Sequence, residues 1–267
     1  MATKMLFHIH TKYSFDSVLE PKKIVDFASR SGFRIIAVTD HNSFEGSLEV
    51  KKIIEKRGLS LIPLQGCEYS TKSGDVIGLF APDFEYDVGV EPNLDILDVV
   101  HKIRKAGGIV ILPHPFKNRK PDGQVLISAD LIEGYNGRMS PSKNQAAMQI
   151  AKEYKKKLIG GSDAHFVKEL GTVVVTFEET INSQMPSWDF LRNLLLKSQC
   201  EIDCQAATVK VKYIYLSFVV KIFKTKDIFT ALVTIARMSL KATRKLLKRI
   251  FLLKHMHVVP PASSDKK

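Results

Sequence analysis

The chain has 267 residues and a formal net charge of +12, with 45% hydrophobic and 25% charged residues. This is the composition of a globular protein that can bury a sizeable core. The chain has three cysteines, an odd number, and its first residues contain no long apolar leader. Both observations argue against a disulfide framework, so we expect a cytoplasmic protein.

The positive charge is concentrated in the C-terminal part of the chain. From Gln205 onward there are 14 Lys and Arg against 2 Asp and Glu, whereas the preceding residues hold 26 of each kind. A neutral body lacks the basic surface that a long nucleic-acid backbone requires. We therefore expect a folded domain over residues 1–204 and an appended tail over residues 205–267.

Apolar runs separated by turn or helix patterns predict a series of strands. In chain order these are MLFHI, RIIAVT, LSLIPLQG, VIGLF, GIVILP, LIEGYN, KLIGG and TVVVTF. Helical patterns lie between several of them: PKKIVDFASRSG, NLDILDVVHKIRKAGG with Asn93 as its expected cap, SPSKNQAAMQIAKEYKKK and SWDFLRNLLLKS. Strands that alternate with helices predict an α/β fold on a parallel sheet, either open or closed into a barrel.

The pattern changes after about residue 204. Cys200 and Cys204 are spaced to share a helix face, and beyond them apolar residues alternate with Lys and Arg at near-helical spacing. The longest uncharged run, YIYLSFVV, is too short to span a bilayer. We expect a basic amphipathic helical tail with a disordered end, whose residues 205–254 dock on a membrane surface or a protein partner. The alternative is a helical cap packed on the main domain.

Ionisable side chains follow the predicted strands at their C-terminal ends. The sets are His8 and His10 with Asp16 in the next loop, Asp40 and His41, Glu68, His114, and Asp163 with His165. In a parallel β/α barrel these ends converge on one rim, where active sites are built. Because side chains alternate along a strand, His8 and His10 point to the same face, although the pair alone fits ordinary polar residues equally well. The ordered set predicts one cavity lined by histidines and carboxylates.

This set favours a metal centre. It exceeds what the proton transfers of one reaction need, and no GxSxG elbow accompanies it. Histidine, aspartate and glutamate together suit two or three divalent ions in an N/O-ligand site. The natural chemistry of closely spaced ions is the hydrolysis of phosphate esters.

The motifs also resemble a known family. HIH with a later Asp, TDHN, a Glu after the third strand, PHP, and GSDAH followed by ELG resemble in order and spacing the PHP (polymerase and histidinol phosphatase) domain, in its stand-alone metal-dependent phosphoesterase branch. IEGYNGR resembles that branch's sixth strand end, and the resemblance covers about residues 5 to 200. The resemblance implies a distorted (β/α)7 TIM-like barrel whose site holds two or three manganese, iron or zinc ions. In this chain the barrel would carry a C-terminal basic helical extension.

Carried over by motif, the resemblance implies a set of ligands. His8, His10, Glu68 and Asp163 would hold the first ion, Glu68 and His114 the second, and Asp16, His41 and His165 the third. A metal-activated hydroxide would attack phosphorus. Many members place another histidine on the strand after the Glu, where this chain has Gly78 with Asp75 as the nearest ligand, so we expect a weaker or empty second site.

Two further residues are catalytic candidates. We expect Asp40 to orient a ligand histidine, with structural capping of its turn as the alternative. We expect Arg138, in YNGR, to bind a substrate phosphate through its guanidinium, with a solvated loop arginine as the alternative.

These observations predict a metal-dependent phosphoesterase. The resemblance suggests as substrate a phosphomonoester, such as a nucleoside bisphosphate or histidinol phosphate, or the 5′ end of a short nucleic acid cut in the 5′-to-3′ direction. Two other functions stay open. One is a non-catalytic metal-stabilised binding module with a docking tail, and the other is a metal-assisted amidohydrolase, in which Arg138 would have little to do.

Overall fold

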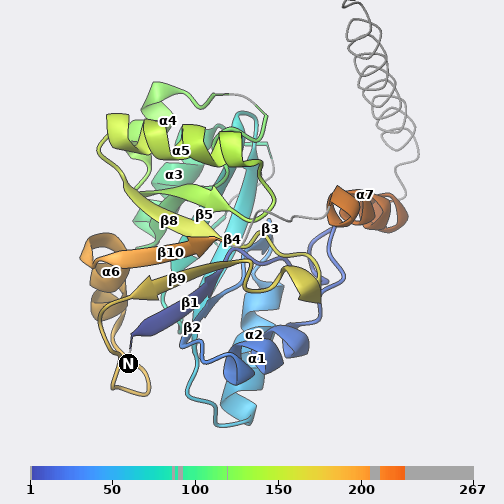
Figure 1. Cartoon of the computed structure of the whole chain (residues 1–267), viewed down its shortest axis with the longest axis vertical. Coiled ribbons are helices and arrows are strands. Elements are labelled where there is room, and N and C mark those ends of the chain that lie inside the picture. Colours follow the sequence, from blue (N-terminus) through green and yellow to red (C-terminus); the bar gives the residue numbers. More distant parts are fainter. Residues whose placement is uncertain (1, 86–87, 90–92, 119, 205–210, 226–267) are drawn as a thin grey trace, which may run out of the picture. The chain divides into compact units, whose positions relative to one another are not determined.

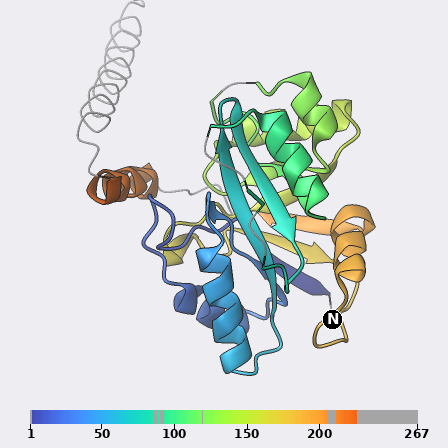
Figure 2. The same ribbon diagram turned by 180° about the vertical axis from the view of Figure 1, so that it is seen from behind.

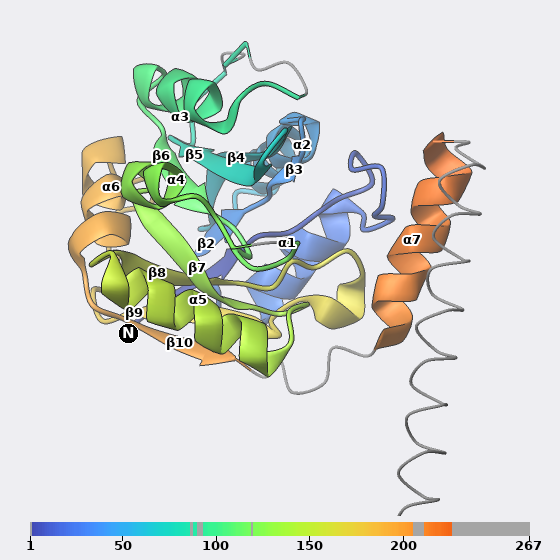
Figure 3. The ribbon, with the colours of Figure 1, turned by 90° about the horizontal axis from the view of Figure 1, so that it is seen from above.

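A computed structural model describes residues 2–85, 88–89, 93–118, 120–204 and 211–225. A mixed sheet curls into a nearly closed barrel, and helices pack around its outside (Figures 1 and 3). Contacts divide the chain into two compact units, Met1–Lys221 and Ile222–Lys267, and the barrel lies in the first. The α/β barrel predicted from the sequence is confirmed. No helix in the described ranges is long and apolar enough to cross a membrane.

The elements alternate along the chain. The strands are β1 (Thr3–Phe7), β2 (Ile35–Ala37), β3 (Asp40–His41), β4 (Ile62–Thr71), β5 (Gly74–Phe80), β6 (Ile109–Leu112), β7 (Leu131–Asn136), β8 (Lys157–Gly161), β9 (Val173–Phe177) and β10 (Cys200–Cys204). The helices are α1 (Pro21–Arg30), α2 (Glu45–Lys56), α3 (Ile96–Lys105), α4 (Gly123–Ser128), α5 (Pro141–Glu153), the short 3₁₀ helix η1 (Val167–Glu169), α6 (Trp188–Lys197) and α7 (Val211–Thr225).

The sheet is only partly parallel. Its order is β10-β9-β1-β2-β4-β5-β6-β7-β8, and β3 pairs with β4. β5 runs antiparallel to both β4 and β6, and β9 runs antiparallel to β1 and β10, so the predicted parallel pairing fails at these strands and holds for the other neighbours. β5 runs antiparallel to β4 because only the short turn at Lys72 and Ser73 joins them, whereas a parallel pair needs a crossover of about a dozen residues or more. Figure 2 shows this long β4–β5 hairpin from behind.

Most predicted elements are present, and the differences have local causes. All the predicted apolar strands form, but Cys200 and Cys204 lie in strand β10 rather than on a helix, because that segment pairs with β9. Helix α3 is capped by Asp95, whose side chain accepts from the Leu97 amide, and not by Asn93. In the tail, α7 is helical as predicted; residues 205–210 and the expected disordered end lie outside the described residues.

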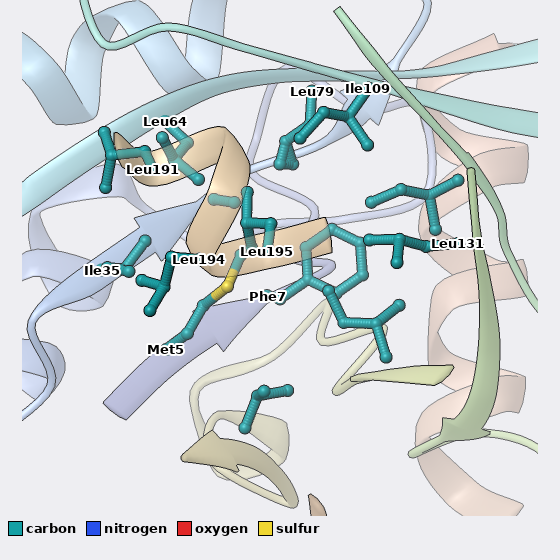
Figure 4. Close-up of a cluster of buried hydrophobic side chains, with 14 of the residues drawn as sticks. Met5, Phe7, Ile35, Leu64, Leu79, Ile109, Leu131, Leu191, Leu194 and Leu195 are labelled. Carbon is teal, nitrogen blue, oxygen red and sulfur yellow. The ribbon is translucent and has the colours of Figure 1, made fainter. Parts of the chain in front are cut away.

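The interior of the barrel is apolar and is closed at one end by α6. Inward side chains of the strands, among them Phe7, Ile111 and Leu131, form one buried cluster. Leu191, Leu194 and Leu195 of α6 belong to the same cluster (Figure 4). The buried leucine face of α6 therefore seals the end of the barrel away from the strand C-termini, and the polar side chains gather at the opposite end.

The ring of strands closes beyond the ends of β1 and β8. The Ser162 amide donates to the Phe7 carbonyl at 3.0 Å, and the His10 amide donates to the Ala164 carbonyl at 2.8 Å. Ile9 and Ala164 form a parallel bridge between these bonds. The closure lies among the residues that the sequence predicted as ligands.

Replacing Leu194 tests the role of α6. Leu194→Ala leaves a cavity in a closed apolar interior, so we expect the free energy of unfolding to fall by about 2–5 kcal/mol while metal stoichiometry is unchanged. Phe190→Ala on the exposed side of the same helix is the matched control and should cost less than about 1 kcal/mol. Denaturant unfolding of both variants measures the difference, and equal losses would contradict the assignment.

Candidate metal centre

The structure brings the predicted metal ligands together at one rim of the barrel. They come from β3 and β4 and from the residues that follow β1, β6 and β8. Ligand atoms within 4.8 Å of one another form four overlapping groups: His10, Asp16, His41 and His165; His8, His114 and Asp163; His8, His10 and Glu68; and Glu68, Asp75 and His114. Segments far apart in sequence therefore share one polar cluster.

Three of these residues have a left-handed backbone. The φ angle is 56° at His8, 27° at His114 and 49° at Asp163. A side chain with a Cβ makes such a conformation cost roughly 1–3 kcal/mol, so it persists only where the surroundings enforce it. The hydrogen bonds between the ends of β1 and β8 enforce it at His8 and Asp163.

The two imidazoles that follow β1 face two buried acids. Nε2 of His10 lies 3.3 Å from Glu68 Oε2 and 3.4 Å from Asp163 Oδ1. Nε2 of His8 lies 3.6 Å and 3.8 Å from the same two oxygens. These four side chains are the ones assigned by resemblance to the first ion, and their spacing leaves room for a shared cation.

A second group forms around the other oxygen of Glu68. His114 Nε2 lies 2.9 Å from Glu68 Oε1, and Asp75 Oδ2 lies 4.0 Å from the same nitrogen. Asp75 thus supplies the second carboxylate of this group.

Gly78 is not a gap in this group. A Cβ at Gly78 would point at Phe80 and Ile103, toward α3 and away from the cluster. Because Asp75 and Gly78 are three positions apart on β5, their side chains leave opposite faces of the strand. β5 presents Asp75 to this group, which is the ligand expected in place of a histidine at Gly78, and a weaker or empty second site stays a prediction.

The third group surrounds Asp16 in the loop after β1. Its Oδ2 lies 3.1 Å from His165 Nε2 and 3.5 Å from His41 Nε2. The ring of His10 lies 4.4 Å from that of His41 and 4.3 Å from that of His165, between centroids. His10 therefore connects the first and third groups.

Hydrogen bonds orient several of the imidazoles. In three rings Nδ1 is hydrogen-bonded to an oxygen: His8 to Glu133 Oε1 at 2.7 Å, His10 to Ser14 Oγ at 3.1 Å, and His165 to the Asp163 carbonyl at 2.9 Å. In each case Nε2 is left to face the cluster. Such bonds fix the tautomer that binds a metal.

Buried polar atoms in the cluster lack hydrogen-bond partners. They are His8 Nε2, His10 Nε2, Asp16 Oδ1, His41 Nδ1 and Glu68 Oε2. Burying such atoms unpaired is costly, and imidazole nitrogen with carboxylate oxygen is the donor set of divalent transition metals. The residues present therefore fit divalent metal ions.

The charges of the cluster favour metal-binding forms at three residues. Burial opposes ionisation of Glu68 and Asp163, but the neighbouring imidazoles bring the pKa of both carboxyls well below the usual range. Burial together with the charges of His165 and His41 lowers the pKa of His10 to about 3. Ionised carboxylates and a neutral imidazole are the states that bind a cation.

Glu133 on β7 is a site residue that the sequence analysis missed. It is buried; its Oε1 accepts from His8, and its Oε2 accepts from the His114 amide at 2.8 Å and from Asn136 Nδ2 at 2.9 Å. Although burial lowers the pKa of His8, Glu133 and the other acids raise it well above the ordinary value, so a bound cation would displace a proton from this ring. The charged residue inside the apolar run LIEGYN was the available signal.

Asp40 contacts the cluster through Ser14. It accepts from the Thr11 amide, the Thr11 hydroxyl and the Ser14 hydroxyl, each at 2.6 Å. Ser14 in turn accepts from His10, so Asp40 orients that ring at one remove while also fixing the loop after β1. Both interpretations of Asp40 thus have contacts to support them, and its catalytic role stays a prediction.

Arg138 makes other contacts than those expected. Its Nε and Nη2 donate to Glu169 at 2.9 Å and 3.1 Å, and Nη2 also donates to Ser217 of α7 at 2.9 Å. Glu169 Oε2 accepts from the amides of His165 and Phe166 at 2.9 Å and 3.1 Å. The guanidinium therefore braces the loop that carries His165, and a substrate role for Arg138 stays a prediction.

Known proteins resemble this chain in sequence and in fold. The family model PHP_C, described as PHP-associated, matches residues 141–199. The uncharacterized protein MJ1587 of Methanocaldococcus jannaschii is 33% identical over 165 residues, which make up 56% of this chain and 92% of that protein. The chain belongs to the PHP domain family.

Several solved structures resemble this PHP domain in fold. A two-domain protein of Bacteroides vulgatus that contains a predicted PHP-like metal-dependent phosphoesterase has a TM-score of 0.60 at 20% identity, and the match covers 76% of this chain and 65% of that one. An amidohydrolase of Chromobacterium violaceum, with bound sulfate and no metal, has a TM-score of 0.51 at 15% identity over 73% of this chain and 97% of that one.

Glu133→Gln tests the support of the ligand rings. The substitution replaces one carboxylate oxygen by an NH₂ group. That group would face either His8 or the two donors His114 N and Asn136 Nδ2, so one of these hydrogen bonds is lost. We therefore expect Mn²⁺ affinity to fall roughly 10- to 100-fold. Calorimetric titration with Mn²⁺ measures the change. Glu153→Gln, on the exposed end of α5, is the control and should bind as the wild type does. Unchanged affinity in Glu133→Gln would show that the ring is held without it.

Proposed function

We propose that this PHP domain hydrolyses phosphate esters with the help of two or three divalent ions. The observation that supports it is the convergence of imidazole and carboxylate atoms, several buried without partners, in overlapping groups that share His8, His10, Glu68 and His114. A purely structural site closes around one ion with about four ligands, whereas this cluster offers more than twice that number. Ions held here would neutralise phosphoryl oxygens and lower the pKa of an attacking water.

A pocket of about 940 Å³ adjoins the cluster and suits an anionic substrate. His114 and Asp75 line it, and so do Lys72, Lys117 and Lys120. Its size is that of small-molecule sites in general. The lysines favour a phosphorylated small molecule such as a nucleoside bisphosphate, or the 5′ end of a short nucleic acid, over a neutral amide.

Lys117 is the cation best placed to bind the scissile phosphate. Its Nζ lies 3.5 Å from Asp75 Oδ2. Partial desolvation lowers the pKa of this exposed lysine, but Glu68, Asp75 and further acids of the cluster raise it above the ordinary value, so the amine stays charged beside the site. It offers the role expected of Arg138, whose guanidinium is bound to Glu169.

Phosphate release with Mn²⁺ tests the proposal. The panel contains phosphomonoesters, nucleoside bisphosphates and short 5′-phosphorylated oligonucleotides, beside an amide panel. We expect one phosphate class to be hydrolysed, EDTA to abolish the activity and Mn²⁺ to restore it. Asp163→Asn removes a carboxylate charge that faces both His8 and His10, and His10→Ala removes an imidazole shared by two groups. Each should lower kcat/KM by roughly a thousandfold or more.

Other outcomes would assign a different function. Hydrolysis of amides without phosphate release would identify an amidohydrolase. A metal-loaded protein that hydrolyses neither panel would be a binding module.

Lys117→Met tests the phosphate contact. Loss of one charged hydrogen bond to the substrate should lower kcat/KM roughly 10- to 100-fold while metal content is retained. Lys105→Met, exposed on α3, is the control. Steady-state kinetics with metal analysis distinguishes a lost substrate contact from a lost ion, and wild-type kinetics in Lys117→Met would exclude this role.

A further inference from the structure

Helix α7 uses one face to contact the rim of the site. Tyr213, Ser217 and Lys221 are spaced four residues apart and so lie on one side of the helix. The Tyr213 ring packs on Phe166 with centroids 5.6 Å apart, and Ser217, which is 5% exposed, accepts from Arg138. This face of the helix is occupied by the barrel domain.

Lys221 continues that contact toward the cluster. Its Nζ lies 4.7 Å from the centroid of the Phe15 ring, which stacks on His41 at 4.5 Å with an interplanar angle of 8°. The inner face of α7 therefore contacts residues next to three ligands of the third group: Phe15 beside Asp16 and on His41, and Phe166 beside His165.

The outer face of α7 is apolar and exposed. Tyr215, Leu216 and Val219 have 46%, 44% and 42% of their surface exposed, and Phe223, one turn further, has 79%. On a helical projection Tyr215, Val219 and Phe223 lie opposite Ser217, and Leu216 lies next to Phe223 at the edge of this face. A soluble surface helix usually presents polar side chains on this side.

The positive charge of the helix and of the sequence around it favours an anionic binding partner at the outer face of α7. From 211 to 225 the helix carries Lys212, Lys221 and Lys224 and no acidic residue. The sequence from Gln205 to the end has 14 basic and 2 acidic residues. A second copy of the chain would bring two such tails together, and their like charges would repel.

We propose that the outer face of α7 binds the surface of an anionic lipid bilayer. An apolar stripe that includes aromatic rings and has a lysine, here Lys212, on the same side lets a helix lie in the headgroup region of an anionic bilayer. Since the inner face contacts the loops after β1 and β8, the metal rim would lie next to the lipid surface.

Vesicle sedimentation of the full-length protein tests the proposal. We expect binding to vesicles of phosphatidylcholine with phosphatidylglycerol, little binding to phosphatidylcholine alone, and weaker binding as salt increases. The double variant Leu216→Glu with Val219→Glu should reduce the partition constant by roughly tenfold or more, since it adds two negative charges and removes apolar contact. Ile127→Glu changes an apolar residue on α4 that is more exposed, at 58%, and this variant should bind as the wild type does.

Three results would overturn the proposal: equal binding to neutral and anionic vesicles, wild-type binding by the double variant, or a wild-type dimer in light scattering that the double variant abolishes. The last would make a second copy the occupant. Circular dichroism and thermal unfolding check that the double variant is folded. Lys212→Glu, on the exposed side of the same helix, gives an independent test of the charge contribution and should also weaken binding to anionic vesicles.

Discussion

The structure depends on the backbone hydrogen bonds that join the end of β1 to the residues after β8. They close the ring of strands and hold His8 and His10 beside Asp163 and His165, from opposite ends of the folded domain. The closure requires a left-handed backbone at two of these residues, which is unfavourable by itself. The apolar interior supplies the compensating free energy, and α6 seals it at the far end. The buried apolar interior at one end of the barrel thus offsets the unfavourable backbone conformations at the other end.

The polar cluster also links metal binding to folding. Its imidazoles and carboxylates are withdrawn from water, and several of their atoms have no protein partner. A cation that binds only the folded arrangement stabilises it in proportion to the affinity and the free ion concentration. The ions that serve the chemistry would therefore also decide how stable the rim is, and a chelator should loosen the rim before the apolar interior.

The sequence predicted the ring of strands and the convergence of the candidate ligands, because both leave periodic or positional signals. Apolar runs mark buried strands, and His or Asp placed just after them marks the rim. It did not predict the reversal of β5, which depends on a short turn. It also did not predict strand β10, whose sequence CEIDC alternates apolar and polar residues over only five positions and which pairs with β9. It also missed Glu133, since a lone acid inside an apolar run acquires meaning only when the fold brings it to His8. Arg138 was predicted as a substrate group because nothing in its motif shows that Glu169 lies opposite.

The antiparallel hairpin has a consequence for how this domain can change. A β/α barrel normally carries a long connection at every strand end on its active rim. Here β4 and β5 are joined at the rim by Lys72 and Ser73, and both residues line the pocket beside His114. Insertions at this turn would lengthen an existing two-stranded ladder without disturbing the register of the ring. The wall of the pocket can therefore evolve in height, and with it the length of the accepted substrate, while the ligand geometry is inherited intact.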